Sequence, residues 1–266
     1  MKKISTLVLI SFLAVVSGCT TVAVTGRKQL ALVPDSELNS MSFQQYGTVL
    51  TESRLSSNEQ QTAQVRSVGV RIQKAVETYM QENNMSDRLK GYAWEFNLIE
   101  ENTVNAWCMP GGKVGFYTGI LPVCGDETGI AVVMGHEVAH AIARHGNERM
   151  TQGLIQQFGG VALAYALKEK PAMTQQLFMG AYGVGTSVGA MLPFSRMQES
   201  EADKMGLIFM AMAGYDPNEA PRFWERMSAN SGGKQPPQFM STHPSHEHRI
   251  ADLQAAIPEA MKYYRK

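Results

Sequence analysis

The feature that most constrains this chain is a pair of histidines four residues apart, His136 and His140, with Glu137 directly after the first. On a helix, residues four apart lie one turn above each other on the same face, so both imidazoles can bind one metal ion. Glu137 projects beside them, where its carboxylate can reach a water molecule at that ion. Apolar residues recur around the pair with helical spacing, and Asp126 is placed to cap the helix. The stretch therefore predicts a buried, metal-binding helix.

A third ligand is expected downstream, because catalytic zinc sites usually take three protein ligands and leave one position for water. Glu199 and Asp203 are four residues apart in a predicted helix that stops before Gly214, so they share a face, whereas Glu201 points elsewhere. Spacing alone leaves two interpretations open. Glu199 is either a metal ligand or part of a charged helix surface beside Lys204.

Taken together, the motifs resemble a known family. His136-Glu137-Val138-Ala139-His140 followed by Glu199-x-x-Ala202-Asp203 is similar to the gluzincin metallopeptidases that include HtpX, the CAAX prenyl proteases and the periplasmic proteins BepA and LoiP. Within that family, the chain is most similar to the mitochondrial inner-membrane stress metalloprotease and its bacterial lipoprotein relatives. The likeness covers nearly all of the chain after residue 18, and its other matching pieces are Val24-Thr25-Gly26-Arg27, Asn105-Ala106-Trp107, residues 112–122, Ala143-Arg144-His145-Gly146, Ser195-Arg196, Thr242-His243-Pro244 and Arg249-Ile250.

The resemblance implies an α+β fold that is mainly α-helical, a zincin-like metalloprotease domain with a small β-sheet beside the motif helix. It implies one Zn²⁺ per chain, held by His136, His140 and Glu199. It assigns Glu137 as the general base and Asp203 as the carboxylate that orients a ligand histidine. The expected function is that of a zinc-dependent endopeptidase with polypeptide substrates.

Two residues near the C-terminus are further candidates for the site. All six histidines lie in two clusters, 136–145 and 243–248, which suggests that the clusters meet. In BepA-like relatives the position of His243 can cap the zinc as a fourth, inhibitory ligand, so His243 is expected to occupy the water position in a resting state. The alternative is a loop histidine that makes one backbone hydrogen bond. Arg249 either pairs with a site carboxylate or helps the oxyanion, and both roles stay open.

Helices are expected at 35–51 and 59–82, and strands at 93–100, 103–109 and 113–117. Pro110-Gly111-Gly112 is a hairpin signal between the last two strands. The edge of such a sheet can hydrogen-bond an extended substrate peptide. The resemblance places Asn105 and Ala106 on that edge, and the alternative is an ordinary hairpin without a role in substrate binding.

The first 18 residues have the pattern of a targeting segment. Lys2 and Lys3 precede an apolar run at 7–16 that is too short to span a bilayer. Val16-Ser17-Gly18-Cys19 resembles a lipobox, in which Cys19 becomes the lipidated N-terminus. The alternative is an ordinary secretory signal with a chance cysteine. We therefore expect a lipoprotein signal peptide at 1–18, a lipidated extended arm at 19–34 and the metallopeptidase domain at 35–266.

The environment expected for the chain follows from the same segment. Thr20 rather than an aspartate follows Cys19, which by analogy favours the outer membrane, with the protein facing the periplasm and held by its lipid anchor. Lys2 and Lys3 account for two of the 24 basic residues, so 22 basic residues face 24 acidic ones after the signal, which argues against nucleic-acid binding. Cys108 and Cys124 are expected to stay unpaired.

One apolar stretch raises the question of a membrane span. Residues 171–195 carry no charge, but glutamines and glycines dilute the run and prolines bracket it. A core helix or a mobile membrane-proximal flap is favoured over a span.

Two further functions compete with the peptidase. One is a lipid-anchored chaperone or binding module with a structural or latched zinc, against which the intact Glu137 argues, because a structural site needs only its ligands. The other is a zinc hydrolase that does not act on peptides. Misfolded or misassembled envelope proteins are the substrates expected by analogy.

Overall fold

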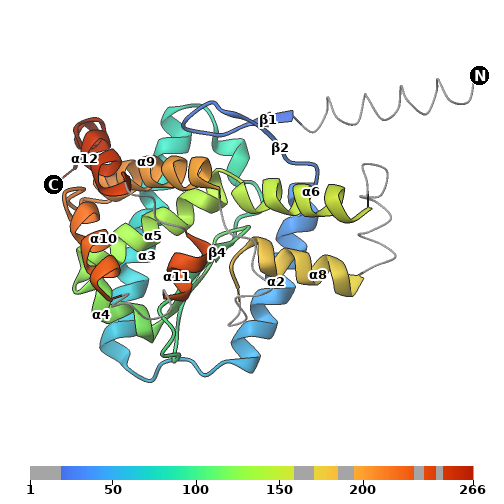
Figure 1. The fold of residues 1–266 in the computed structure, drawn as a ribbon, viewed down its shortest axis with the longest axis horizontal. Coiled ribbons are helices and arrows are strands. Elements are labelled where there is room, and N and C mark those ends of the chain that lie inside the picture. The colour runs from blue at the N-terminus through green and yellow to red at the C-terminus, as the bar shows by residue number, and fades with distance from the viewer. Residues whose placement is uncertain (1–18, 159–170, 185–194, 231–236, 244–247, 266) are drawn as a thin grey trace, which may run out of the picture.

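The computed structural model describes residues 19–158, 171–184, 195–230, 237–243 and 248–265 (Figure 1). The expected signal peptide at 1–18, and with it most of the lipobox, lies outside the described residues. So do residues 185–194 of the apolar run at 171–195. Among the helices of the described parts, none has both the length and the apolar character that a membrane crossing requires.

The motif helix, α5 (Glu127–Ile142), lies at the centre of the fold (Figure 1). The Asp126 side chain accepts hydrogen bonds from the backbone amides of Thr128 and Gly129, which confirms the predicted N-cap. Residues 129–142 are all buried. A helix that is buried all round must satisfy its polar side chains within the protein, so His136, Glu137 and His140 need partners on neighbouring elements.

The second site helix, α9 (Arg196–Met212), begins at a capping box in which Ser195 and Gln198 exchange side-chain hydrogen bonds with each other's backbone amides. It packs directly against α5, and the two backbones meet at a pair of glycines. A Cβ atom on Gly135 would lie 2.9 Å from the carbonyl oxygen of Gly206. The absence of side chains at this contact therefore lets α9 approach close enough to place its acidic residues beside the motif histidines.

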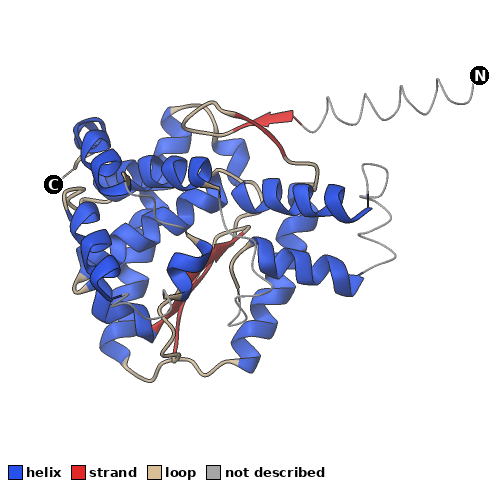
Figure 2. Ribbon diagram, in the orientation of Figure 1, coloured by secondary structure: helices blue, strands red, loops and turns tan. Residues whose placement is uncertain are grey.

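A three-stranded sheet lies beside α5 (Figure 2). Its order is β3 (Glu95–Ile99), β5 (Lys113–Tyr117), β4 (Ala106–Met109), with β3 parallel and β4 antiparallel to β5. The hairpin between β4 and β5 is confirmed, and its turn is made by Gly111 and Gly112 at φ +74° and +80°. The first and second strands are shorter than predicted. Within the described residues β4 pairs only with β5 and is an edge strand.

The other helices surround these elements. The predicted helices α2 (Asp35–Glu52) and α3 (Glu59–Glu82) are confirmed almost to the residue. The further helices are α4 (Leu121–Cys124), α6 (His145–Phe158), α8 (Pro171–Ala181), α10 (Glu219–Asn230), α11 (Gln238–Thr242) and α12 (Arg249–Ala260), with 3₁₀ turns at Ser86–Leu89, Thr118–Ile120 and Met261–Tyr263. The main core joins α3, α5, α9, α10 and the sheet, and a smaller one lies between α2, α6 and α8. The predicted α+β, mainly α class is confirmed, and Cys108 and Cys124 are buried and unpaired.

The N-terminal arm differs from the extended segment expected at 19–34. It folds back as an antiparallel hairpin of β1 (Cys19–Thr21) and β2 (Lys28–Leu30). The turn is closed by a 2.8 Å hydrogen bond from the amide of Val22 to the carbonyl of Arg27, and Gly26 adopts φ +70°. The Gln29 side chain donates to the carbonyl of Ala143 at the end of α5. The arm is therefore bound to the end of the motif helix through its second strand.

Candidate metal centre

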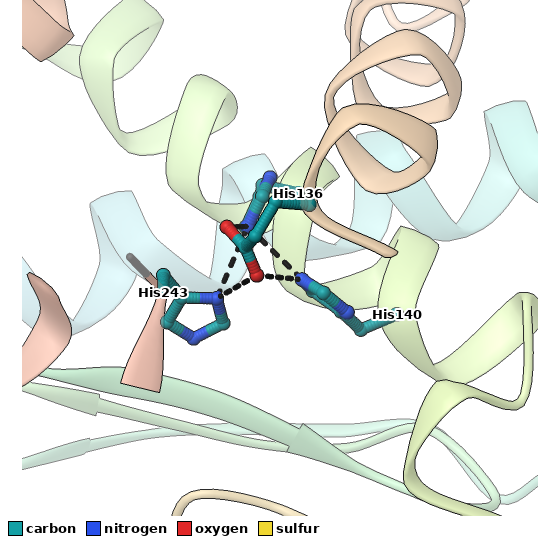
Figure 3. A group of neighbouring side chains, drawn as sticks. His136, His140 and His243 are labelled. Atoms are coloured by element: carbon teal, nitrogen blue, oxygen red, sulfur yellow. Dashed lines mark hydrogen bonds and ion pairs between the residues drawn. The ribbon is translucent and has the colours of Figure 1, made fainter. Parts of the chain in front are cut away.

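Four buried side chains converge from three elements (Figure 3). His136 and His140 come from α5, Glu199 comes from the first turn of α9, and His243 directly follows α11. Each of the four is at most 4% exposed. The two histidine clusters of the sequence therefore meet, through one member of the C-terminal cluster. His248 of that cluster is exposed at the start of α12.

The spacing of the four donor atoms can be compared with a metal site. The Nε2 atom of His136 lies 3.1 Å from Nε2 of His140 and 3.2 Å from Nδ1 of His243. The Glu199 oxygens lie 3.4, 3.3 and 3.1 Å from the nearest nitrogens of His136, His140 and His243. A tetrahedral zinc ion with bonds of about 2.0–2.1 Å separates its ligand atoms by roughly 3.3–3.4 Å. The donor set therefore fits zinc in both chemistry and spacing.

The ring of His136 is oriented from the side opposite the cluster. Its Nδ1 atom lies 2.9 Å from Oδ1 of Asp203, one turn along α9 from Glu199. Burial lowers the pKa of the His136 ring, but hydrogen bonds to Asp203 and Glu199 outweigh burial and raise that pKa to about 9. With a metal ion in the cluster, Asp203 keeps the ring proton on Nδ1 and the lone pair of Nε2 binds the ion. Metal binding at Nε2 would take the place of the second ring proton that the carboxylates otherwise favour.

Arg249 holds the carboxylates of α9. It donates from Nη1 to Glu199 at 2.9 Å and from Nη2 to Asp203 at 2.7 Å, and its guanidinium lies 3.5 Å from the ring centre of Trp224. Burial would raise the pKa of the Glu199 carboxyl, but His243 and Arg249 hold it well below its usual range. Both terminal nitrogens of Arg249 are thus engaged by carboxylates, which is the pairing alternative of the sequence analysis.

Glu137 lies beside the cluster but outside the four donors. It is 3% exposed, and its Oε1 atom lies 3.4 Å from Nε2 of His243. Burial raises the pKa of the Glu137 carboxyl, and the neighbouring rings of His243 and His136 partly counter that rise. A carboxyl whose affinity for a proton is raised, and which lies beside a candidate metal site, is suited to accept and return a proton.

Strands of the sheet run past the cluster (Figure 3), and the edge of the candidate substrate strand β4 is covered. Asn105 and Ala106 are both buried, at the start of β4. The Asn105 side chain donates to the carbonyl of Gly183 at 3.5 Å, and the amide of Phe239 in α11 donates to the carbonyl of Val104 at 3.1 Å. The same short helix therefore carries His243 into the cluster and lies over the end of the edge strand.

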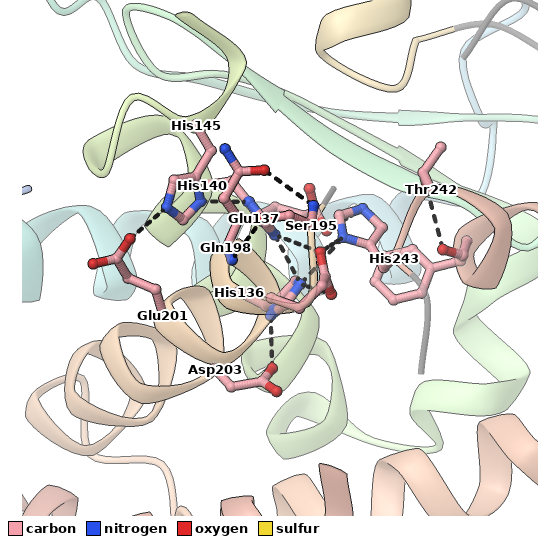
Figure 4. A network of polar contacts seen from close by, with 12 residues as sticks. His136, Glu137, His140, His145, Ser195, Gln198, Glu201, Asp203, Thr242 and His243 are labelled. Atoms are coloured by element: carbon pink, nitrogen blue, oxygen red, sulfur yellow. Dashed lines mark hydrogen bonds and ion pairs between the residues drawn. The ribbon is translucent and has the colours of Figure 1, made fainter. Parts of the chain in front are cut away.

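Sequence reasoning missed a second set of contacts, behind His140 (Figure 4). Nδ1 of His140 lies 2.8 Å from Nδ1 of His145, whose Nε2 lies 2.9 Å from a carboxylate oxygen of Glu201. Glu201 also binds Arg27 of the N-terminal arm at 2.8 Å. Glu201 does point away from the cluster, as its spacing predicts. The signal that could have found this set was present, because Thr25-Gly26-Arg27 and His145 lie within motifs that the resemblance already includes.

The sequence is similar to a known peptidase family and to several of its members. The model of peptidase family M48 matches residues 68–257, more than half of the chain. The mitochondrial metalloendopeptidase OMA1 of Schizosaccharomyces pombe is 40% identical over 169 residues, 63% of this chain and 48% of that protein. OMA1 of Saccharomyces cerevisiae is 36% identical over 66% of this chain and 50% of its own length. The β-barrel assembly-enhancing protease of Escherichia coli is 29% identical over 64% and 37%, respectively.

These findings confirm the mitochondrial and BepA branches of the predicted resemblance, while the likeness to lipoproteins stays a prediction. The chain spans about half the length of the OMA1 proteins it matches. The family match includes both site helices, His243 and Arg249. The chain therefore belongs to peptidase family M48, and the chemistry expected of it is that of a metalloendopeptidase.

Proposed function

We propose that this chain is a zinc-dependent endopeptidase that binds one Zn²⁺ through His136, His140 and Glu199. The observation that carries the proposal is the buried group of donor atoms at tetrahedral spacing, with the Glu137 carboxylate beside it. Zinc, when bound, supplies a Lewis acid that polarises the scissile carbonyl and acidifies the attacking water. The family assignment favours peptides over other substrates of zinc hydrolases.

The chain's own residues supply the remaining steps. Glu137 takes the proton from the attacking water and delivers it to the leaving amine. Asp203 keeps the His136 ring in the tautomer and orientation that a ligand needs. Arg249 holds Glu199 and Asp203 in place and keeps both carboxylates ionised. We assign no oxyanion role to Arg249, since both of its terminal nitrogens already bind carboxylates.

Substrate binding on β4 requires a rearrangement of α11. An extended peptide can add to the edge strand at Asn105 and Ala106 only after Phe239 of α11 and Gly183, which follows α8, are withdrawn. The movement of α11 would also take His243 out of the donor group. We therefore propose that the structure is a resting form in which His243 occupies the position that the attacking water needs.

A His243→Ala variant tests this resting form. We expect higher peptidase activity than wild type, because the fourth donor is removed while the three proposed ligands stay. The matched control is His248→Ala, which changes an exposed histidine at the start of α12. Activity of His243→Ala equal to or below that of wild type, with zinc still bound, would contradict the resting form.

Anchoring and location are proposed on the sequence pattern. In this proposal residues 1–18 are a lipoprotein signal peptide, Cys19 carries the lipid, and the domain that begins at Asp35 faces the periplasm from the outer membrane. Misfolded or misassembled envelope proteins are the proposed substrates. The name of the E. coli relative, β-barrel assembly-enhancing protease, is consistent with an envelope role.

A second function is favoured by one observation. A group of four protein donors is typical of structural zinc sites, so a permanently closed site would make the chain a lipid-anchored binding or chaperone module. The peptidase requires Glu137 as its general base, whereas a structural zinc site does not need Glu137.

Casein cleavage by the soluble form that begins at Thr20, with its zinc content measured, separates them. We expect one zinc per chain, activity lost on chelation, and a loss of about 10³-fold or more in Glu137→Gln. The matched control is Glu225→Gln, an exposed glutamate of α10. One zinc with no activity in wild type, Glu137→Gln or His243→Ala would support the structural site instead.

A further inference from the structure

A continuous series of side-chain contacts joins the N-terminal arm to His140. Arg27 donates from Nε to Glu201 at 2.8 Å, and the same carboxylate oxygen lies 2.9 Å from Nε2 of His145. Nδ1 of His145 lies 2.8 Å from Nδ1 of His140. The hydroxyl of Thr25 donates to the other oxygen of Glu201. Figure 4 shows the inner part of this series, from Glu201 through His145 to His140.

One placement of the ring protons satisfies the contacts of this series. Nε2 of His140 faces Glu199 and His136, so as a metal donor it carries a lone pair and the ring proton lies on Nδ1. That proton is donated to Nδ1 of His145. His145 then carries its own proton on Nε2 and donates it to Glu201. Each ring is thereby fixed in tautomer and rotation by the next group outward.

The series is buried and charged at its outer end. His145 is 0% exposed and Glu201 is 6% exposed. Burial raises the pKa of the Glu201 carboxyl, but hydrogen bonds from His145, Thr25 and Arg27 outweigh burial and lower it to about 2. Arg27 also donates two hydrogen bonds to Glu148, at 3.0 and 2.9 Å, so its guanidinium is held between two carboxylates. Two of the three partners of Glu201 thus belong to the arm.

The backbone between the site helix and His145 is shaped for this contact. Arg144 adopts φ +62°, a left-handed conformation that is unfavourable for a non-glycine residue. This conformation ends α5 and turns the chain so that α6 begins at His145, with its ring directed back under His140. Such conformations persist where the surrounding structure requires them.

We propose that the N-terminal arm is part of the support of the metal centre, and that Arg27, with Thr25, acts as a positioning residue for the His140 ligand through Glu201 and His145. The proposal rests on the proposed metal site. In this proposal the arm has two roles, because it links the domain to the lipid on Cys19 and also supports the metal centre. Release of the arm from α6 and α9 would leave Glu201 without its cation and His140 without a fixed ring.

Zinc affinity, measured by chelator competition on the chain that begins at Thr20, tests the proposal. Arg27→Gln is expected to weaken zinc binding by up to about 10-fold, the lower end of the usual cost of losing a group that orients a metal ligand, because Arg27 acts through Glu201 and His145. With zinc saturating, kcat is expected to fall while KM for casein stays within about twofold, because Arg27 is remote from the substrate strand. Arg27→Lys keeps the charge and is expected to recover most of the zinc affinity.

The matched control is Arg88→Gln. Arg88 also binds the arm, through the carbonyl and hydroxyl of Thr21, but it has no link to Glu201. We expect its zinc affinity and kcat to equal those of wild type. A loss in Arg88→Gln as large as that in Arg27→Gln would show that arm docking in general, and not the series through Glu201, supports the site.

A second, milder variant keeps the test valid if Arg27→Gln fails to fold. Thr25→Val preserves side-chain shape and removes one hydrogen bond to Glu201, so a fall in zinc affinity of a few fold is expected with an unchanged melting temperature of the apo form. Wild-type zinc affinity in both Arg27→Gln and Thr25→Val would overturn the proposal. That outcome differs from failure of the proposed function, in which the wild-type chain itself binds no zinc.

Discussion

The two motif histidines are supported by different regions of the molecule. His136 is held by Asp203 directly, and Asp203 is held by Arg249 from the C-terminal helix α12. His140 is held through one more group, His145, before the series reaches a carboxylate, Glu201, and an arginine from the N-terminal arm. In both cases an imidazole leads to a carboxylate on α9 and then to an arginine from one end of the chain.

The comparison shows how much of the site depends on one helix. α9 supplies the proposed third ligand, Glu199, and also Asp203 and Glu201, one for each histidine. The direct support is the more deeply buried, since the side chain of Arg249 is 1% exposed and that of Arg27 is 17% exposed. A charge-assisted hydrogen bond to the ligand ring itself is stronger than one relayed by a neutral ring. We therefore expect larger losses of stability and of zinc affinity from changes in the support of His136 than from changes in the support of His140.

The largest difference is expected when each arginine is removed. Arg249→Gln leaves Glu199 and Asp203 buried without their cation, which should lower the free energy of unfolding by about 3–5 kcal/mol. Arg27→Gln should cost about 1 kcal/mol, because the Arg27 side chain is 17% exposed and water can partly replace its guanidinium. Urea unfolding of the apo proteins measures both. Equal losses would contradict the difference in burial on which the comparison depends.

The next difference concerns the two carboxylates. Asp203→Asn should weaken zinc binding by about 100-fold, and Glu201→Gln by about 10-fold, because Glu201 acts through His145. Chelator competition provides the measurement, with Glu225→Gln as a control at an exposed site. A larger loss of zinc affinity in Glu201→Gln than in Asp203→Asn would show that the indirect support of His140 is stronger than the direct support of His136.

A change at the helix crossing should damage both supports together. A Cβ atom at Gly206 would lie 3.0 Å from the backbone nitrogen of His136 and 3.0 Å from the carbonyl carbon of Gly135. Gly206→Ala should therefore push α9 away from α5, with a cost of about 1–3 kcal/mol in unfolding free energy and weaker zinc binding. Gly47→Ala, at an exposed site where nothing lies within 4 Å of the added Cβ atom, is the control. An unchanged zinc affinity in Gly206→Ala would mean that the crossing tolerates the added methyl group.

The smallest expected effect is a pH dependence of the N-terminal support. The pKa of Glu201 in the folded chain is lowered to about 2, so its ionised form stabilises the fold above the unfolded-state value of about 4.3. That contribution is lost as pH falls from there towards 2. The gap in apo melting temperature between wild type and Glu201→Gln should thus be constant from pH 7 to 5 and narrow by pH 3. A gap that is unchanged at pH 3 would show that the ionised carboxylate contributes nothing.

The sequence predicted the parts of the site that follow from helical spacing. His136 and His140 come together because of their position on one helix, and Glu199 and Asp203 share a face for the same reason. The hairpin turn at Gly111 and Gly112 was also readable from local residue types. These features depend on neighbours within a few residues, where backbone geometry leaves few alternatives.

The contacts of the arm could not be predicted in this way. Arg27 meets residues more than a hundred positions away, and nothing in local spacing relates Arg27 to Glu201 or to His145. Likewise, Gly135 and Gly206 are ordinary helix residues until the two helices are seen to cross. The arm is a hairpin and not the extended segment that was expected, for the same reason. Its turn is stabilised by contacts of Thr25 and Arg27 with Glu201, which is distant in sequence.

Zinc content and affinity of the purified chain test the central claim most directly, that one metal ion lies between α5, α9 and α11. We predict one zinc per chain in wild type, retention of that zinc in His243→Ala, and its loss in Glu199→Ala at a zinc concentration that saturates wild type. Less than about a tenth of an equivalent in wild type under saturating zinc, or undiminished binding in Glu199→Ala, would contradict the account.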